Sequence, residues 1–186
     1  MSRESSITAR LARLGFAQTQ SCAEAIEKYP LLENVLEYLK DAADPDLALL
    51  TLSKLIETGA VDFGGFEHDQ WQKLTGLLGS SLVLGEHLIK HPNQVLYVAS
   101  SEGVPARDVL ITNLLSSIAS QSDWDQSLIE LRIAYRREVC AIAALDVVAK
   151  AESTSILPGI ATALRDRKST RLNSSHTDIS RMPSSA

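Results

Sequence analysis

The longest continuous structural signal in the chain runs over residues 123–150, which contain neither glycine nor proline. Apolar residues recur there at helical spacing, as at Leu128 and Leu131, and a cap at Ser122 or Asp123 would open the helix. A run of this length without a breaker residue is typical of a single long α-helix. We find no period-two alternation bounded by turns, so no β-sheet is expected. The sequence predicts an all-α protein, an irregular multi-helix bundle with one long helix near 123–150.

Shorter helices precede the long one, and glycine or proline separates them. Asp44 is expected to cap the helix that Pro45 opens, and Gly79 to end the helix that contains Trp71. Gly64 and Gly65 mark a loop. The expected helices span 7–14, 21–28, 31–39, 45–58, 71–78, 84–89 and 106–119, and a last one would lie within 153–164.

Composition and charge exclude several classes of protein. With 45% hydrophobic and 22% charged residues, the chain can bury a core. Its net charge of -5, without a basic stripe, argues against nucleic-acid binding. Apolar runs are too short to span a bilayer, and no secretory signal is recognisable, so no membrane and a cytoplasmic location are expected. Cys22 and Cys140 are expected to be small core residues rather than a disulfide, and no CxxC pair suggests zinc.

The last part of the chain changes character abruptly. It is rich in serine and arginine and shows no hydrophobic period. Residues 166–176 (DRKSTRLNSSH) back-translate into one frame of a common short-read sequencing adapter, and residues 180–186 match that adapter's later fixed part. We interpret 166–186 as a translated sequencing adapter, a disordered artefactual C-terminal tail and not a domain. A natural disordered polar tail is the alternative. The adapter interpretation predicts that the natural chain continues past about residue 165.

Few polar residues are candidates for a site. His87 and His91 lie one helical turn apart, but neither a third ligand nor a general base lies nearby in sequence. A buried polar role for His87 and a helix-end role for His91 are the expected alternative. Arg132, Arg136 and Arg137 form a basic patch, either a partner contact or a solvated face paired with Glu130 or Glu138. Trp71 and Trp124 are expected to anchor the core.

Three stretches resemble the amino-terminal region of the bifunctional glutamine synthetase adenylyltransferase/adenylyl-removing enzymes, especially actinobacterial ones. Residues 10–16 (RLARLGF) are similar to the family's opening element. Residues 44–50 (DPDLALL) with 77–92 (LLGSSLVLGEHLIKHP) resemble a helix pair of the family, and 131–146 (LRIAYRREVCAIAALD) its long helix. Order and spacing agree from Ile7 to Leu164. Leu145 departs from the pattern, because the family usually has an arginine there.

The resemblance implies that residues 1–165 are the helical amino-terminal region of a multifunctional nucleotidyltransferase. Such an enzyme attaches AMP to glutamine synthetase and removes it, using Mg²⁺ and ATP. It answers to a nitrogen-signalling regulatory protein and so controls nitrogen assimilation. The family's glycine-serine turn with paired aspartates is expected beyond this chain. Asp44 and Asp46 lack those glycines, and Gly64-Gly65 lacks the residues of a phosphate loop.

No catalytic, cofactor-binding or metal residue is therefore expected here, and the fragment alone is expected to be inactive. The alternative is a non-enzymatic all-helical adaptor or interaction domain. A helical ligand-binding bundle is a further possibility, but the chain lacks the convergent polar residues such a bundle needs.

Overall fold

The computed structural model describes residues 3–119, 121 and 123–151, and this part of the chain forms helices and no strand. The all-α prediction is therefore confirmed. The predicted helix within 153–164 and the segment 166–186 lie outside the described residues. The helices are α1 Arg3–Arg13, α2 Thr19–Lys28, α3 Leu31–Asn34, α4 Leu36–Leu39, α5 Pro45–Glu57, α6 His68–Ser80, α7 Leu82–Lys90, the 3-10 helix η1 Pro92–Gln94, α8 Val95–Ala99, α9 Arg107–Ile118 and α10 Trp124–Ala151.

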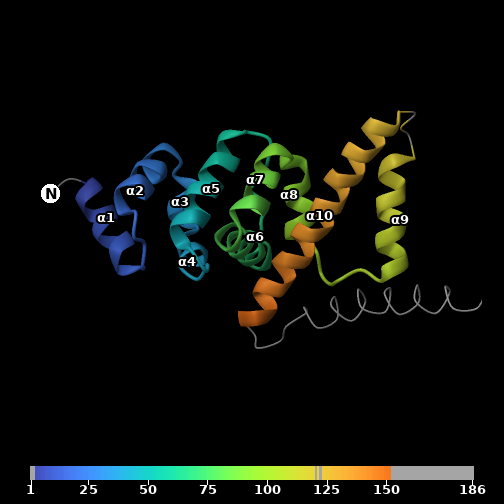
Figure 1. Ribbon diagram of the computed structural model, residues 1–186. Helices are drawn as coiled ribbons and strands as arrows, with labels where there is room; N and C mark the ends of the chain where they lie inside the picture. Colours follow the sequence, from blue (N-terminus) through green and yellow to red (C-terminus); the bar gives the residue numbers. More distant parts are fainter. Residues whose placement is uncertain (1–2, 120, 122, 152–186) are drawn as a thin grey trace, which may run out of the picture.

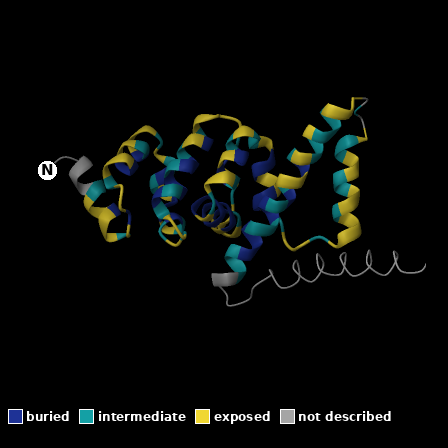
Figure 2. Cartoon of the chain, in the orientation of Figure 1, coloured by how far each residue is buried: buried dark blue, intermediate teal, exposed yellow. Residues whose placement is uncertain are grey.

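The helices follow one another along the molecule in sequence order, from α1 at one end to a hairpin of α9 and α10 at the other (Figure 1). Helix α6 lies in the middle and packs against α4, α5, α7, α8 and α10. Its residues from Leu74 to Gly79 are all buried, and the buried positions concentrate on it and on the helices around it (Figure 2). No helix in the described part of the chain is long and apolar enough to cross a membrane.

Local capping signals place several helices where the sequence predicts them. Asp44 caps α5, because its carboxylate accepts a hydrogen bond from the backbone N–H of Leu47 at 2.9 Å. Asp123 accepts one from the N–H of Gln126 at 3.0 Å and opens α10. Gly59 follows α5 with a φ of 64°, a left-handed conformation that glycine adopts without strain. Ser81 caps α7, because its hydroxyl accepts a hydrogen bond from the backbone N–H of Leu84.

Asp46 has a different role from its neighbour Asp44. The backbone N–H groups of Ala17 and Gln18 donate to its two carboxylate oxygens at 2.9 and 2.8 Å, so Asp46 caps α2 from the first turn of α5. The Cys22 thiol lies 3.4 Å from the same carboxylate. Burial, and then the hydrogen bond to Asp46, raise the pKa of Cys22 to about 12. Both aspartates therefore act at helix starts, Asp44 at that of α5 and Asp46 at that of α2.

Two expectations about helix ends need correction. The predicted helix 31–39 is broken into α3 and α4 at Val35, whose φ and ψ of -105° and 9° leave the helical region. Its apolar stripe is nevertheless largely buried, with Leu32, Leu36 and Leu39 in the core. Gly79 does not end its helix but lies inside α6, where a Cβ atom would come 2.7 Å from Ala42 Cβ.

Both cysteines are buried and free, as predicted. Trp71 is buried and its ring packs with Phe63, Phe66 and Tyr38, so its prediction as a core anchor is also confirmed. Trp124 is not a core anchor, because 74% of it is exposed. It begins α10 at the far end of the hairpin, away from α6.

Candidate interaction surface on the long helix

The two candidate metal ligands, His87 and His91, form part of a helix end. The buried His87 Nε2 lies 2.9 Å from Gln94 Oε1, which joins α7 to η1. His91 is the C-cap of α7, and its ring centroid lies 4.7 Å from that of His87. Desolvation lowers the pKa of His87, although the hydrogen bond to Gln94 opposes the shift. No group of three potential metal ligands exists among the described residues, so the structural interpretation of this pair is favoured.

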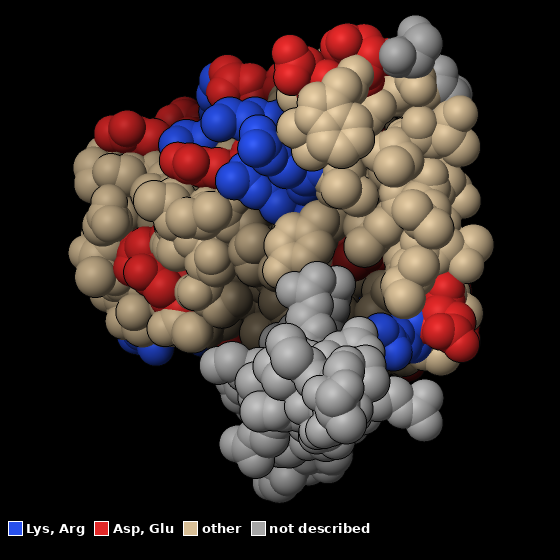
Figure 3. Space-filling view, turned by 45° about the vertical axis from the view of Figure 1, so that its right-hand side comes forward, with Lys and Arg blue, Asp and Glu red and all other residues tan. Residues whose placement is uncertain are grey.

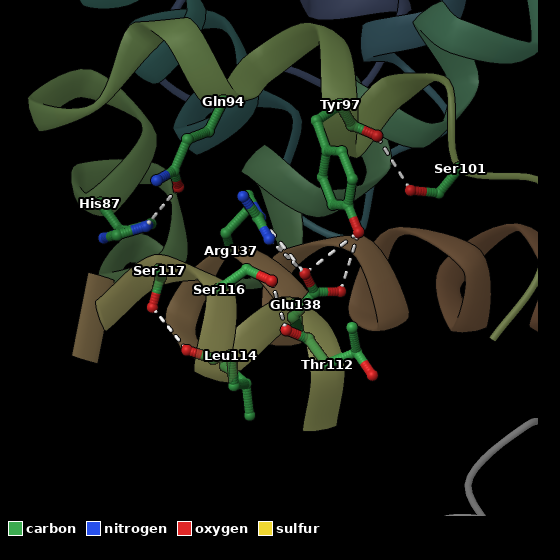
Figure 4. Close-up of polar contacts among 10 residues, drawn as sticks. All are labelled: His87, Gln94, Tyr97, Ser101, Thr112, Leu114, Ser116, Ser117, Arg137 and Glu138. Carbon is green, nitrogen blue, oxygen red and sulfur yellow. Dashed lines mark hydrogen bonds and ion pairs between the residues drawn. The ribbon is translucent and has the colours of Figure 1, made fainter. Parts of the chain in front are cut away.

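The second half of α10 is fixed to the body by a buried carboxylate. Tyr97 of α8 donates its hydroxyl to the Glu138 carboxylate, 3.1 and 2.9 Å from its two oxygens, and Arg137 forms an ion pair with it at 2.6 Å. The Arg137 guanidinium also lies 4.5 Å from the centre of the Tyr97 ring. Figure 4 shows Tyr97 pointing onto Glu138, with Arg137 beside them. Sequence analysis did not identify Tyr97, because its partner lies on another helix.

The predicted basic patch divides into two parts with different surroundings. Arg137 belongs to the Tyr97–Glu138 cluster, which confirms the predicted pairing with Glu138 for this arginine. Arg132 and Arg136 are exposed, and within the described residues neither makes an ion pair. Glu130, the other predicted partner, instead accepts a hydrogen bond from Gln126 at 2.9 Å. Figure 3 shows basic side chains gathered in one cluster on this side of the molecule.

Large apolar side chains accompany the two free arginines on α10. Successive residues of a helix are about 100° apart, so Trp124, Ile129, Arg132, Tyr135 and Arg136 all fall on one side. All five are exposed, and 59% of Tyr135 is accessible. We call these five residues the outer face of α10. The opposite side of the helix contains Ala134, Glu138 and Ala141, which are buried.

Helix α9 adds to this exposed surface. None of its residues is buried, and Val109, Ile111 and Leu115 are among the exposed large hydrophobic residues. The hydroxyls of Thr112, Ser116 and Ser117 donate to carbonyls of α9 itself, so these polar groups do not tie α9 to its neighbour (Figure 4). At about 100° per residue, the apolar residues of α9 other than Val109 fall on one side of the helix, and an apolar stripe of this kind is typical of a helix that packs against further structure. That pattern was visible in the sequence and could have identified α9 as a contact element.

The arrangement on the outer face of α10 is suited to binding another protein surface. Tryptophan, tyrosine and arginine are the residues that most often dominate the energy of protein interfaces. Exposed aromatic side chains bury much area on contact, and the two arginines provide donors for carboxylates. By contrast, the part of the chain that the structure describes contains no cluster of three or more acidic, histidine or cysteine side chains that could hold a metal ion.

Comparisons with known proteins give one consistent result. The chain is 30% identical, over 89% of its length, to the bifunctional glutamine synthetase adenylyltransferase/adenylyl-removing enzyme of Cutibacterium acnes. The proteins of the same name from Mycobacterium tuberculosis and Streptomyces avermitilis are 31% and 33% identical, over 84% and 87% of the chain. The chain spans only 19%, 16% and 17% of these three relatives. No protein-family model and no solved structure matches the chain.

Proposed function

We propose that this chain, which is similar over 80–89% of its length to bifunctional glutamine synthetase adenylyltransferase/adenylyl-removing enzymes, is the amino-terminal helical scaffold of such an enzyme. The parent protein would add AMP to glutamine synthetase with ATP and Mg²⁺, remove it again, and respond to a nitrogen-signalling regulatory protein in the cytoplasm. The helical segment would position the removing domain and present glutamine synthetase to it. The similarity to these enzymes is the observation that carries the proposal.

The chemistry of the described residues supports a scaffold and not a catalytic role. Nucleotidyl transfer requires acidic oxygens that hold Mg²⁺ beside the nucleotide phosphates. The acidic residues with prominent contacts here are each engaged in structure: Asp44 and Asp46 cap helices, and Glu138 fixes α10. We therefore assign the reacting groups to the remaining part of the parent polypeptide, and this chain to orientation and support.

A non-enzymatic helical adaptor is the alternative function for the same exposed surface. It would use the outer face of α10 to bind a separate protein and would need no further domain. The adaptor is not favoured, because the similarity extends across most of the chain to proteins that are named as enzymes.

The proposal is tested by measuring AMP release from adenylylated glutamine synthetase, with phosphate and Mg²⁺ present. We expect the chain alone to give no release above the blank. The longer reading frame, recovered from the source DNA, should release AMP, and with ATP it should also attach it. Release by the chain alone, or none by the longer frame, would contradict the proposed function.

A further inference from the structure

We infer that the outer face of α10 docks against another part of the same polypeptide, one that presents apolar side chains and carboxylates. This inference rests on the proposed function, because it assumes that the chain is part of a longer enzyme. It goes beyond that function by naming the contact surface, its chemistry and its occupant.

The apolar content of the surface indicates a permanent contact. On α10, 74% of Trp124 and 59% of Tyr135 are exposed, and on α9, 57% of Leu115 is exposed. Large exposed apolar residues gathered on neighbouring helices indicate an interaction site, and permanent interfaces are more apolar than transient ones. A segment of the same chain is always present at the surface, whereas a substrate protein leaves after each reaction. The exposed aromatic residues therefore favour an occupant within the polypeptide.

The charges on the face define the chemistry of that occupant. Arg132 and Arg136 lie one helical turn apart, both are exposed, and neither forms an ion pair within the described residues. The chain as a whole is acidic, with a net charge of -5, so these two arginines form a local positive region. An arginine pair of this kind is matched by carboxylates, which accept its N–H groups in pairs.

The length of the relatives supports an occupant within the same polypeptide. The chain covers 15–19% of the relatives it matches, so more than four-fifths of each relative lies outside the similarity. The hairpin of α9 and α10 stands at one end of the helical array (Figure 1). A second copy of this chain would also cover apolar side chains, but it would bring its own two arginines against a positive face.

Hydrogen–deuterium exchange of two proteins, the chain and the longer reading frame, tests the inference. We expect peptides from α9 and from residues 124–136 to exchange about tenfold more slowly in the longer protein, because docking suppresses local opening. Peptides from α6, which is already buried, should exchange equally in both. A dilution series of the chain reports self-association, and protection of the hairpin that rises with concentration would identify a second copy as the occupant and overturn the inference.

Charge reversal distinguishes docking from a general change in stability. The variant Arg132→Glu/Arg136→Glu in the longer protein should return the hairpin to the exchange rate of the chain alone, with α6 unchanged. Lys54→Glu is the matched control, because Lys54 is exposed on α5 and should leave the hairpin protected. Equal hairpin exchange in both proteins, while the longer one still releases AMP from glutamine synthetase, would overturn the docking alone. Protection without any such activity would leave the docking in place and overturn the proposed function.

Discussion

Two glycine residues of α6, Gly76 and Gly79, lie where an added side-chain atom would collide with a neighbouring segment. A Cβ atom at Gly79 would lie 2.7 Å from Ala42 Cβ and 2.9 Å from the Asp44 carbonyl oxygen. A Cβ at Gly76 would come 2.6 Å from Val147 Cγ1 on α10. These positions allow neighbouring backbones to approach closely, which a side chain would prevent.

The replacement Gly79→Ala should lower the free energy of unfolding by about 2 kcal/mol. Alanine favours a helix by about 1 kcal/mol, but overpacking against a fixed backbone oxygen costs more than that gain. Urea denaturation measures the difference. Gly65→Ala is the matched control, since an added Cβ there meets no atom within 4 Å. Equal midpoints for the two variants would show that the approach at Gly79 is not limiting.

His87 should make the stability depend on pH. Desolvation lowers its pKa in the folded state below the ordinary 6.5, with a smaller contribution from His91, Arg136 and Lys90. The unfolded chain therefore binds the proton more readily, so the stability associated with neutral His87 is present above about pH 6.5 and is lost as the pH falls.

We expect the urea midpoint to fall more steeply between pH 7.5 and 5 in the unsubstituted chain than in the His87→Gln variant. Glutamine keeps a polar partner for Gln94 and does not titrate in this range. His68→Gln, at the exposed first residue of α6, serves as the control and should keep the steep dependence. Urea midpoints that change with pH in parallel for the unsubstituted chain and the His87→Gln variant would contradict a neutral, buried His87.

At the scale of elements, the two halves of α10 are held by different contacts with the neighbouring helices. The second half is tied to α8 through Tyr97, Arg137 and Glu138, and it packs on α6. The outer face lies largely on the first half, where α9 is the neighbouring helix. The long helix therefore connects a buried core to an exposed surface.

Removing the hydroxyl of Tyr97 tests this tie. Tyr97→Phe should destabilise the fold by about 1–2 kcal/mol, because the Glu138 carboxylate loses a hydrogen bond while it stays buried. Tyr135→Phe removes the same group from an exposed ring and should change stability by less than about 0.5 kcal/mol. Denaturation of both variants under one set of conditions provides the comparison, and similar losses would argue against the carboxylate tie.

The sequence predicts the elements better than their surroundings. The bounds of α5 follow from neighbours along the chain, with Asp44 as cap, Pro45 in the first turn and Gly59 at the end. The burial of Trp71 and the exposure of Trp124 depend on helices far away in sequence, so the same residue type at two helix starts had opposite outcomes. Gly79 was misjudged for the same reason, since its close neighbours Ala42 and Asp44 belong to another segment.

The candidate surface was predicted in part. The arginines at positions 132, 136 and 137 are recognisable from their helical spacing, but their division into one buried ion pair and two free charges requires knowledge of where α8 lies. Trp124 beside them was assigned to the core, because an apolar residue on a helix looks the same whether the chain itself or a later domain covers it.

At the scale of the whole molecule, we propose that the ordered helical array is part of a larger enzyme. The relatives are more than five times as long as the segment they share with this chain. In this proposal the array around α6 supplies rigidity, the outer face of α10 supplies the contact to a following domain, and the chemistry lies in that domain.

Sequencing the source DNA across the codon for residue 165, in a library made with a different adapter, is the direct test of this proposal. We expect codons 166–186 to disappear and the frame to continue into a glycine-rich segment with paired aspartates. Reappearance of the same 166–186 codons in genomic DNA, followed by a stop, would contradict it and would leave an isolated helical adaptor as the function of the chain.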